Sequence, residues 1–221
     1  MIDETLRKLN YDRAMAVRKE SIIRESSFLP ITLDIAGIEV NQFNFNHYVL
    51  LDFLNNPILN GGDIESADIL TFIWVVSTQY KPNDKAAFDE FVATKCLGID
   101  YDKAFDECVE YLSDGLMDIG GDTNPENIIP KSNKTPYYSW IVTYIDFIAS
   151  QYGWTPEYIM KMPVAQVFQY SRIIEERLSA ANGKKVQFAN KLSDSANAAI
   201  LKYLQSKAET ENKILVLPDK E

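Results

Sequence analysis

The chain has 221 residues, long enough for one sizeable core, and 46% of them are hydrophobic and 12% aromatic. This mixture is typical of a folded domain and excludes a disordered chain. The formal net charge of −10 would repel nucleic-acid phosphates, so we expect no general binding of nucleic acid. The most basic stretch, from Arg7 to Arg24, also contains acidic residues. This mixture of charges is typical of a helix face that is exposed to solvent.

The sequence shows neither a membrane span nor a secretory signal. Its longest apolar run, from Ile69 to Val76, is interrupted only by Thr71 and falls far short of the roughly 20 residues that cross a bilayer. Cys96 and Cys108 are too few and too widely spaced for a paired-cysteine zinc site, which favours reduced core residues. We therefore expect a cytoplasmic protein that does not enter membranes.

A helix and a hairpin are expected near the N-terminus. Residues 3–25 have an amphipathic helical pattern with one apolar stripe. The stripe is formed by Leu6, Leu9, Ala16, Val17 and Ile23. Residues 31–42 alternate around Ala36 and Gly37, which predicts paired strands at 31–35 and 38–42. Because such a hairpin is too short to be stable alone, it must pack on other elements.

From residue 44 onward the pattern is helical. A first helix ends before Pro57, and residues 56–63, "NPILNGGD", have the two adjacent glycines of a turn. Ser66 is the expected N-cap of a helix of about fourteen residues that is apolar nearly all the way round and therefore belongs at the centre of a bundle. The same run would also fit a buried strand, but the cap and the length favour a helix. Two acidic helices are expected at 83–97 and 101–119.

The second half begins with a predicted long loop at residues 120–135, the best candidate for an internal boundary. In the helix that follows, both faces are apolar, so neighbours should cover it on both sides. A last helix is expected at 193–208, and residues 209–221 form a predicted tail with one apolar patch, Ile214 to Leu217.

Two prolines predict a sharp corner between these helical segments. Thr155 is a good N-cap for a short helix, with Pro156 at its first position. Pro163 disfavours the helical conformation at Met162 and can itself start the next helix. Trp154 stands at the beginning of this corner.

The candidate partner-binding residues lie at the corner. They are Trp154, Met160, Met162 and Phe168. Such side chains either close the core or present an adaptable apolar patch to a partner helix, and core closure is favoured.

Together these elements predict a mainly α fold, an irregular helical bundle with a small N-terminal β-hairpin. We expect an N-terminal part at residues 1–43, a helical domain at 44–208 with a subdivision at 120–135, and a flexible tail at 209–221. Since several helices are apolar on more than one face, we also expect self-association or binding to a helical partner.

No constellation of catalytic residues supports an enzyme. His47 is the only histidine, and a packed or surface position is the favoured interpretation. The carboxylates between Asp100 and Glu110 lack the spacing of a calcium loop, which favours a solvated acidic face. As a helix-turn-helix reader of DNA, the corner would present two acids besides polar side chains and lacks a flanking basic set for phosphates, so we do not expect this function either. The side chains on that helix are Gln166, Gln169, Arg172, Glu175 and Glu176. No catalytic residue, metal or cofactor is predicted.

Two segments of the sequence carry a family resemblance. "ADILTFIWVVSTQYKP", residues 67–82, and "YGWTPEYIMKMPVAQVFQYSRII", residues 152–174, resemble segments of tail assembly chaperones of long-tailed bacteriophages and related small phage morphogenesis proteins. The second segment has the "GW" before a proline-capped helix and the "MP" step that starts the next helix. The resemblance covers about 40 of the 221 residues.

This resemblance implies a non-enzymatic chaperone in the host cytoplasm that binds the tape-measure protein and helps recruit tail-tube subunits. The chain is long for such a protein, and its N-terminal helix and hairpin are not part of the pattern. A structural virion protein, an adaptor, or a general helical interaction module are the alternatives.

Overall fold

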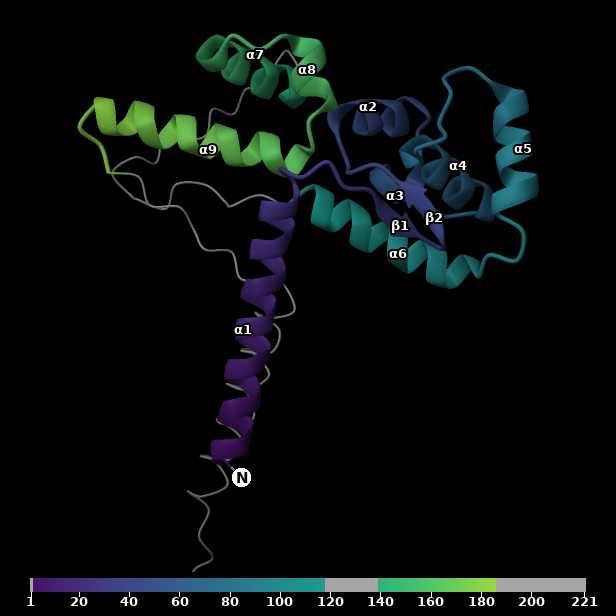
Figure 1. Ribbon diagram of the computed structural model, residues 1–221, viewed down its shortest axis with the longest axis horizontal. Helices are drawn as coiled ribbons and strands as arrows, with labels where there is room; N and C mark the ends of the chain where they lie inside the picture. The colour runs from purple at the N-terminus through teal and green to yellow at the C-terminus, as the bar shows by residue number, and fades with distance from the viewer. Residues whose placement is uncertain (1, 118–138, 186–221) are drawn as a thin grey trace, which may run out of the picture. The chain divides into compact units, whose positions relative to one another are not determined.

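The computed structural model describes residues 2–117 and 139–185 (Figure 1). The chain divides into two compact units, one formed by Met1–Ile23 with Asn190–Glu221 and the other by Arg24–Ala189. In the first unit the described element is helix α1 (Ile2–Ser26), whose last turn belongs to the second unit. The helix has the expected extent, but most of its predicted apolar stripe lies outside the described side chains.

The hairpin opens the second unit. Strands β1 (Leu33–Ile35) and β2 (Ile38–Val40) pair antiparallel, and Ile35 lies opposite Ile38. The two turn residues both have positive φ, 53° at Ala36 and 79° at Gly37, as a two-residue hairpin turn requires. The predicted hairpin is therefore confirmed, with shorter strands than expected.

Helices α2 (Phe45–Phe53), α3 (Pro57–Asn60) and α4 (Ser66–Val76) follow. A short helix stands at Pro57 where the sequence predicted a turn, because the Asn56 side chain accepts a hydrogen bond from the Ile58 N–H and caps it. The predicted N-cap of α4, Ser66, was also wrong by one residue. Glu65 stays extended while its N–H donates to Asp68, so Ser66 is already helical.

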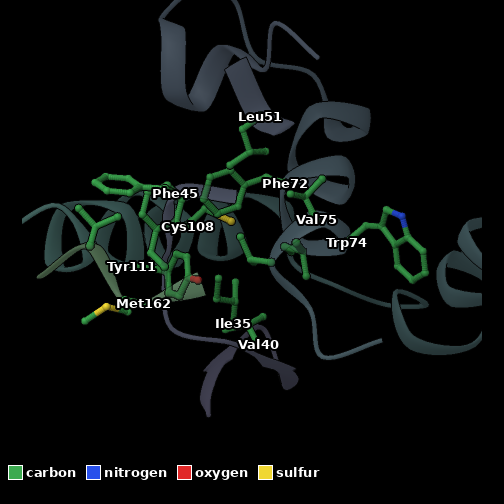
Figure 2. Packing of buried hydrophobic residues seen from close by; sticks show 14 of the residues in the cluster. Ile35, Val40, Phe45, Leu51, Phe72, Trp74, Val75, Cys108, Tyr111 and Met162 are labelled. Atoms are coloured by element: carbon green, nitrogen blue, oxygen red, sulfur yellow. The ribbon is translucent and has the colours of Figure 1, made fainter. Parts of the chain in front are cut away.

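Helix α4 lies at the centre of the second unit. It contacts α2, α3, β2, α5 (Lys85–Lys95) and α6 (Tyr101–Gly115), and it is buried from Phe72 to Val76. Figure 2 shows Phe72 and Val75 from α4 packed in the same cluster as Ile35 and Val40 from the hairpin. The hairpin is thus stabilised by the helices it packs on, as its length requires.

Helix α6 (Tyr101–Gly115) crosses beneath this core. Cys108 and Tyr111 from α6 are buried in it, and Cys96 at the end of α5 is also a free, buried thiol. Both acidic helices are shorter than expected. Helix α5 begins only after its N-cap Asp84 and ends at Lys95, whereas α6 begins at Tyr101 as expected, capped by Asp100, but ends at Gly115.

The remaining helices are α7 (Trp140–Tyr152), α8 (Pro156–Lys161) and α9 (Val164–Ala181). Figure 1 shows α7 and α9 running side by side, and the two helices are in contact. The expectation that α7 is covered on both faces was partly wrong, because Val142 remains half exposed. The mainly α fold with its small hairpin agrees with the prediction.

Several predictions lie outside the described residues. They are the loop at 120–135, the helix at 193–208 and the tail at 209–221. Among the helices in the described ranges, none has the length and the apolar character that a bilayer crossing requires.

Candidate functional site

The two-proline corner is tied to the start of α2. Thr155 caps α8 by accepting a hydrogen bond from the Tyr158 N–H, as predicted. Pro163 is the N-cap residue of α9 rather than its first helical residue, and it forms an isolated bridge with Asn44. The Val164 N–H donates to the Phe43 carbonyl at 2.9 Å. These contacts hold the corner against the segment that leads from the hairpin into α2.

An aromatic cluster surrounds the corner, formed by Phe28, Tyr152, Trp154, Tyr158 and Tyr170. Trp154 stacks on Tyr152 at a centroid distance of 4.7 Å and meets the edges of Tyr158 and Tyr170. Tyr170 in turn meets Phe28 at 5.6 Å. Each ring contact of this kind contributes about 0.5–1.5 kcal/mol beyond the burial of area. The cluster therefore joins the loop after α1 to the corner.

The apolar loop formed by residues 27–31 is held in place by two glutamine side chains. The Gln42 amide donates to the carbonyls of Leu29 and Ser26, at 2.8 Å and 3.1 Å. The Gln169 amide, from α9, donates to the Arg24 carbonyl and to the Ser27 hydroxyl. A further bond from the Gln42 amide reaches the Ile31 carbonyl at 3.5 Å. Because these bonds hold the backbone from Ser26 to Ile31, this loop keeps its apolar side chains at the surface.

A groove of about 580 Å³ lies between this loop and the corner. Its apolar wall is formed by Phe28, Leu29, Pro30, Ile31, Tyr158, Met162 and Pro163. Its polar lining consists of Ser27, Asn41, Gln42, Asn44, Lys161 and Gln166. Leu29 and Tyr158 are 55% and 54% exposed, so large apolar side chains stand at its rim. We call this feature the corner groove.

The structure separates the four candidate residues of the corner. Met162 and Phe168 are buried in the core, and Met162 lines the corner groove with its remaining surface. Trp154 is half-buried in the aromatic cluster, and Met160 lines a separate hollow with Asn46. The side chains therefore mainly close the core, which was the favoured interpretation. Their role in binding a partner stays a prediction.

Sequence reasoning missed the loop at residues 27–31. In its sequence, "SFLPI", the first four residues have the pattern of a connection between a helix and a hairpin, and Ile31 is the first residue of the predicted strand 31–35. Three large apolar residues in a short linker that ends the first helix were the available signal, since loops of a globular protein are usually polar.

Burial explains the ionisable groups with large shifts. It lowers the pKa of His47 to about 4 and raises the pKa of the Cys108 thiol to about 12. It also raises the pKa of Tyr111, whose hydroxyl donates to the Asn41 carbonyl at 2.6 Å. His47 caps α2 together with Asn44, so the packed position is confirmed. None of these groups lines the corner groove.

Two acidic residues at α6 have structural roles. Asp100 caps the helix, and Glu107 accepts a hydrogen bond from the Ala36 N–H that lowers the pKa of its carboxyl group. Within residues 2–117 and 139–185, no three His, Cys, Asp or Glu side chains are grouped so that they could hold a metal ion. The corner groove is one of several hollows on the described surface.

Comparisons of the chain with protein-family models, with curated proteins and with solved structures gave no match.

Proposed function

We propose that this protein is a non-enzymatic binding protein that holds a segment of a partner polypeptide in the corner groove. One observation carries the proposal: a groove with exposed apolar side chains on a backbone that hydrogen bonds already fix. Since the loop at 27–31 is ordered before a partner arrives, binding costs less conformational entropy than ordering a free loop would.

The lining of the groove suits a polypeptide. Amide side chains such as Asn41 and Gln166 both donate and accept hydrogen bonds, as a peptide backbone does. The apolar wall can cover the side chains of an apolar segment, while Tyr158 combines a flat apolar ring with a polar tip. Among the described residues of the lining, Lys161 is the only charged side chain, so a strongly charged ligand would find few partners there.

We further propose that the partner is a phage tape-measure protein and that the chain acts as a tail assembly chaperone, which also helps recruit tail-tube subunits. The support is the resemblance of residues 152–174 to such chaperones, because this segment also forms one wall of the corner groove. The other resembling segment, residues 67–82, includes α4 and supports the core instead. A structural virion protein or an adaptor with the same groove is the alternative.

The proposal is tested by co-expression with the tape-measure protein from the same genome. The groove variant carries Leu29→Ser and Tyr158→Ala together, and the control is Leu97→Ser, a residue 80% exposed in the turn after α5. The control should keep its melting temperature within about 2 °C, because Leu97 is exposed. The groove variant should lose about 2–5 °C, because Tyr158→Ala removes the ring contact with Trp154, and it should still be folded in the assay. The groove variant should lose about tenfold or more in affinity for the tape-measure protein, and the control should not.

One outcome would contradict binding in the corner groove, and another would contradict the phage assignment. If the groove variant copurifies with the tape-measure protein as well as the wild type does, the partner binds elsewhere on the chain. If the gene stands in a metabolic operon with no tape-measure gene beside it, the phage assignment is wrong, while binding of another polypeptide in the groove remains testable.

A further inference from the structure

The C-terminal end of α2 exposes three large apolar side chains. Phe53 is 84% exposed, and Val49 and Leu54 are also exposed. Val49 and Phe53 are four residues apart and thus lie on the same face of the helix. We call these three residues the α2 ridge. A phenylalanine held so fully in water is unusual on the surface of a single domain.

The α2 ridge is not a frayed helix end. The N–H groups of Leu54 and Asn56 donate to the carbonyls of Leu50 and Leu51, at 3.0 Å and 2.9 Å. The buried Asn56 side chain then donates to the Asp68 carbonyl at 2.9 Å. This bond fixes the turn after α2 against the first turn of α4. The backbone that carries Phe53 is therefore held from both sides.

The segments joined to the α2 ridge, in the sequence or through the Asn56 bond, are acidic. Asp52 lies beside Phe53 in the sequence, and Asp63 and Glu65 stand just before α4, the helix to which the turn is bonded. All three carboxylate side chains are exposed. Between Arg24 and Lys81 the sequence has seven acidic residues and no lysine or arginine.

The α2 ridge is distinct from the corner groove. The groove reaches α2 only at its N-cap, Asn44, and Lys161 lies beside Asn46 near the same end. Phe53 stands at the opposite end of this nine-residue helix, roughly 12 Å away along the axis. The positive charge of Lys161 therefore belongs to the groove side, and the ridge keeps its acidic border.

From this combination we propose that the α2 ridge is a second docking surface, and that its occupant is a basic amphipathic helix of a partner protein. The apolar face of such a helix would cover Phe53 and Val49, while its lysines or arginines would face Asp52, Asp63 and Glu65. Complementary charge speeds the encounter and disfavours acidic partners, and the apolar anchor supplies most of the affinity. A second copy of this acidic chain would bring like charges together, which argues against self-association through this surface.

The probe for the test is a synthetic peptide of about 18 leucine and lysine residues, placed so that leucines form one face of a helix. A matched peptide carries glutamate in place of lysine. Fluorescence anisotropy with the full chain should show saturable binding of the lysine peptide, weakening as salt rises, and no binding of the glutamate peptide.

Two variants locate the binding. Phe53→Ser should weaken binding of the lysine peptide about tenfold or more. The control is Leu97→Ser, because Leu97 is also a highly exposed apolar residue, and it should change the affinity less than about twofold. Both variants should unfold at the wild-type temperature, since neither side chain is buried. Replacing Asp52 and Asp63 by Asn and Glu65 by Gln should also weaken binding and flatten its salt dependence.

The proposal fails if Phe53→Ser binds the lysine peptide as tightly as the wild type. It also fails if Leu97→Ser loses as much affinity as Phe53→Ser, because the peptide would then bind exposed apolar side chains wherever they stand on the chain. Equal binding of the glutamate peptide would show that the acidic border plays no part.

Discussion

Acidification from pH 8 to pH 5 should destabilise this protein through His47, its only histidine. The imidazole is 7% exposed, and its ring lies 6.0 Å from the ring of Phe43. Its Nδ1 atom accepts a hydrogen bond from the Asn44 N–H at 3.4 Å, which requires that Nδ1 carry no proton. Protonation would therefore place a charge in the core and remove half of the capping box of α2.

The magnitude follows from the two pKa values of His47. Burial lowers its pKa from 6.5 to about 4 in the folded protein. Between these values the unfolded chain binds a proton that the folded chain does not, so the free energy of unfolding falls as the pH falls. The loss is about 2 kcal/mol at pH 5 and approaches about 3 kcal/mol below pH 4.

Urea denaturation of the wild type and of His47→Gln, each at pH 8 and pH 5, measures this loss. Glutamine at the third helical position can keep the capping box but does not titrate. Carboxyl groups such as Glu107, whose pKa is also lowered, destabilise both proteins in acid and cancel in the comparison. The wild type should lose about 2 kcal/mol more than the variant. If the two proteins lose the same free energy, His47 is not buried in its neutral form.

Three further substitutions test the packing. Gly115→Ala should cost about 1–3 kcal/mol in urea denaturation, because its new Cβ would stand 2.5 Å from the Cβ of Phe43; an unchanged stability would show that α6 is not this close. Ala36→Asn should raise the melting temperature by a few degrees, since asparagine tolerates the positive φ at Ala36 better and Asn-Gly favours this hairpin turn; a lower temperature would contradict the turn geometry. Trp154→Ala should cost about 3 kcal/mol in thermal unfolding by removing three ring contacts of the aromatic cluster, and a loss below about 1 kcal/mol would show that the cluster does not support the corner.

The local structure was largely predictable from the sequence. Thr155 and Pro156 determine where α8 begins, because a side-chain cap and a fixed φ act within one turn of the chain. The pair Ala36-Gly37 likewise marks the hairpin, although the strands are shorter than the alternation suggested. The small errors, such as the cap of α4 at Glu65, come from competition between neighbouring polar side chains that could each cap the helix.

The candidate site was less predictable, because it depends on contacts between distant residues. Gln42 and Gln169 hold the loop at 27–31, and neither position has a sequence pattern that indicates this role. The apolar character of Met162 and Phe168 was visible, but periodicity alone does not show which apolar side chains a neighbouring element covers. The exposure of Phe53 was not predicted for the same reason. The apolar pattern of its helix does not show whether another element covers the end of that helix.

Site-specific photocrosslinking tests the central claim, that a partner polypeptide lies in the corner groove, most directly. In one protein a benzophenone amino acid replaces Tyr158 at the rim of the groove. In the control it replaces Leu97, an exposed residue in the turn between α5 and α6. Each protein is co-expressed with the tape-measure protein of the same genome. The proposal predicts that position 158 crosslinks to one segment of the tape-measure protein and that position 97 does not. Crosslinks from position 97 with none from position 158 would contradict it.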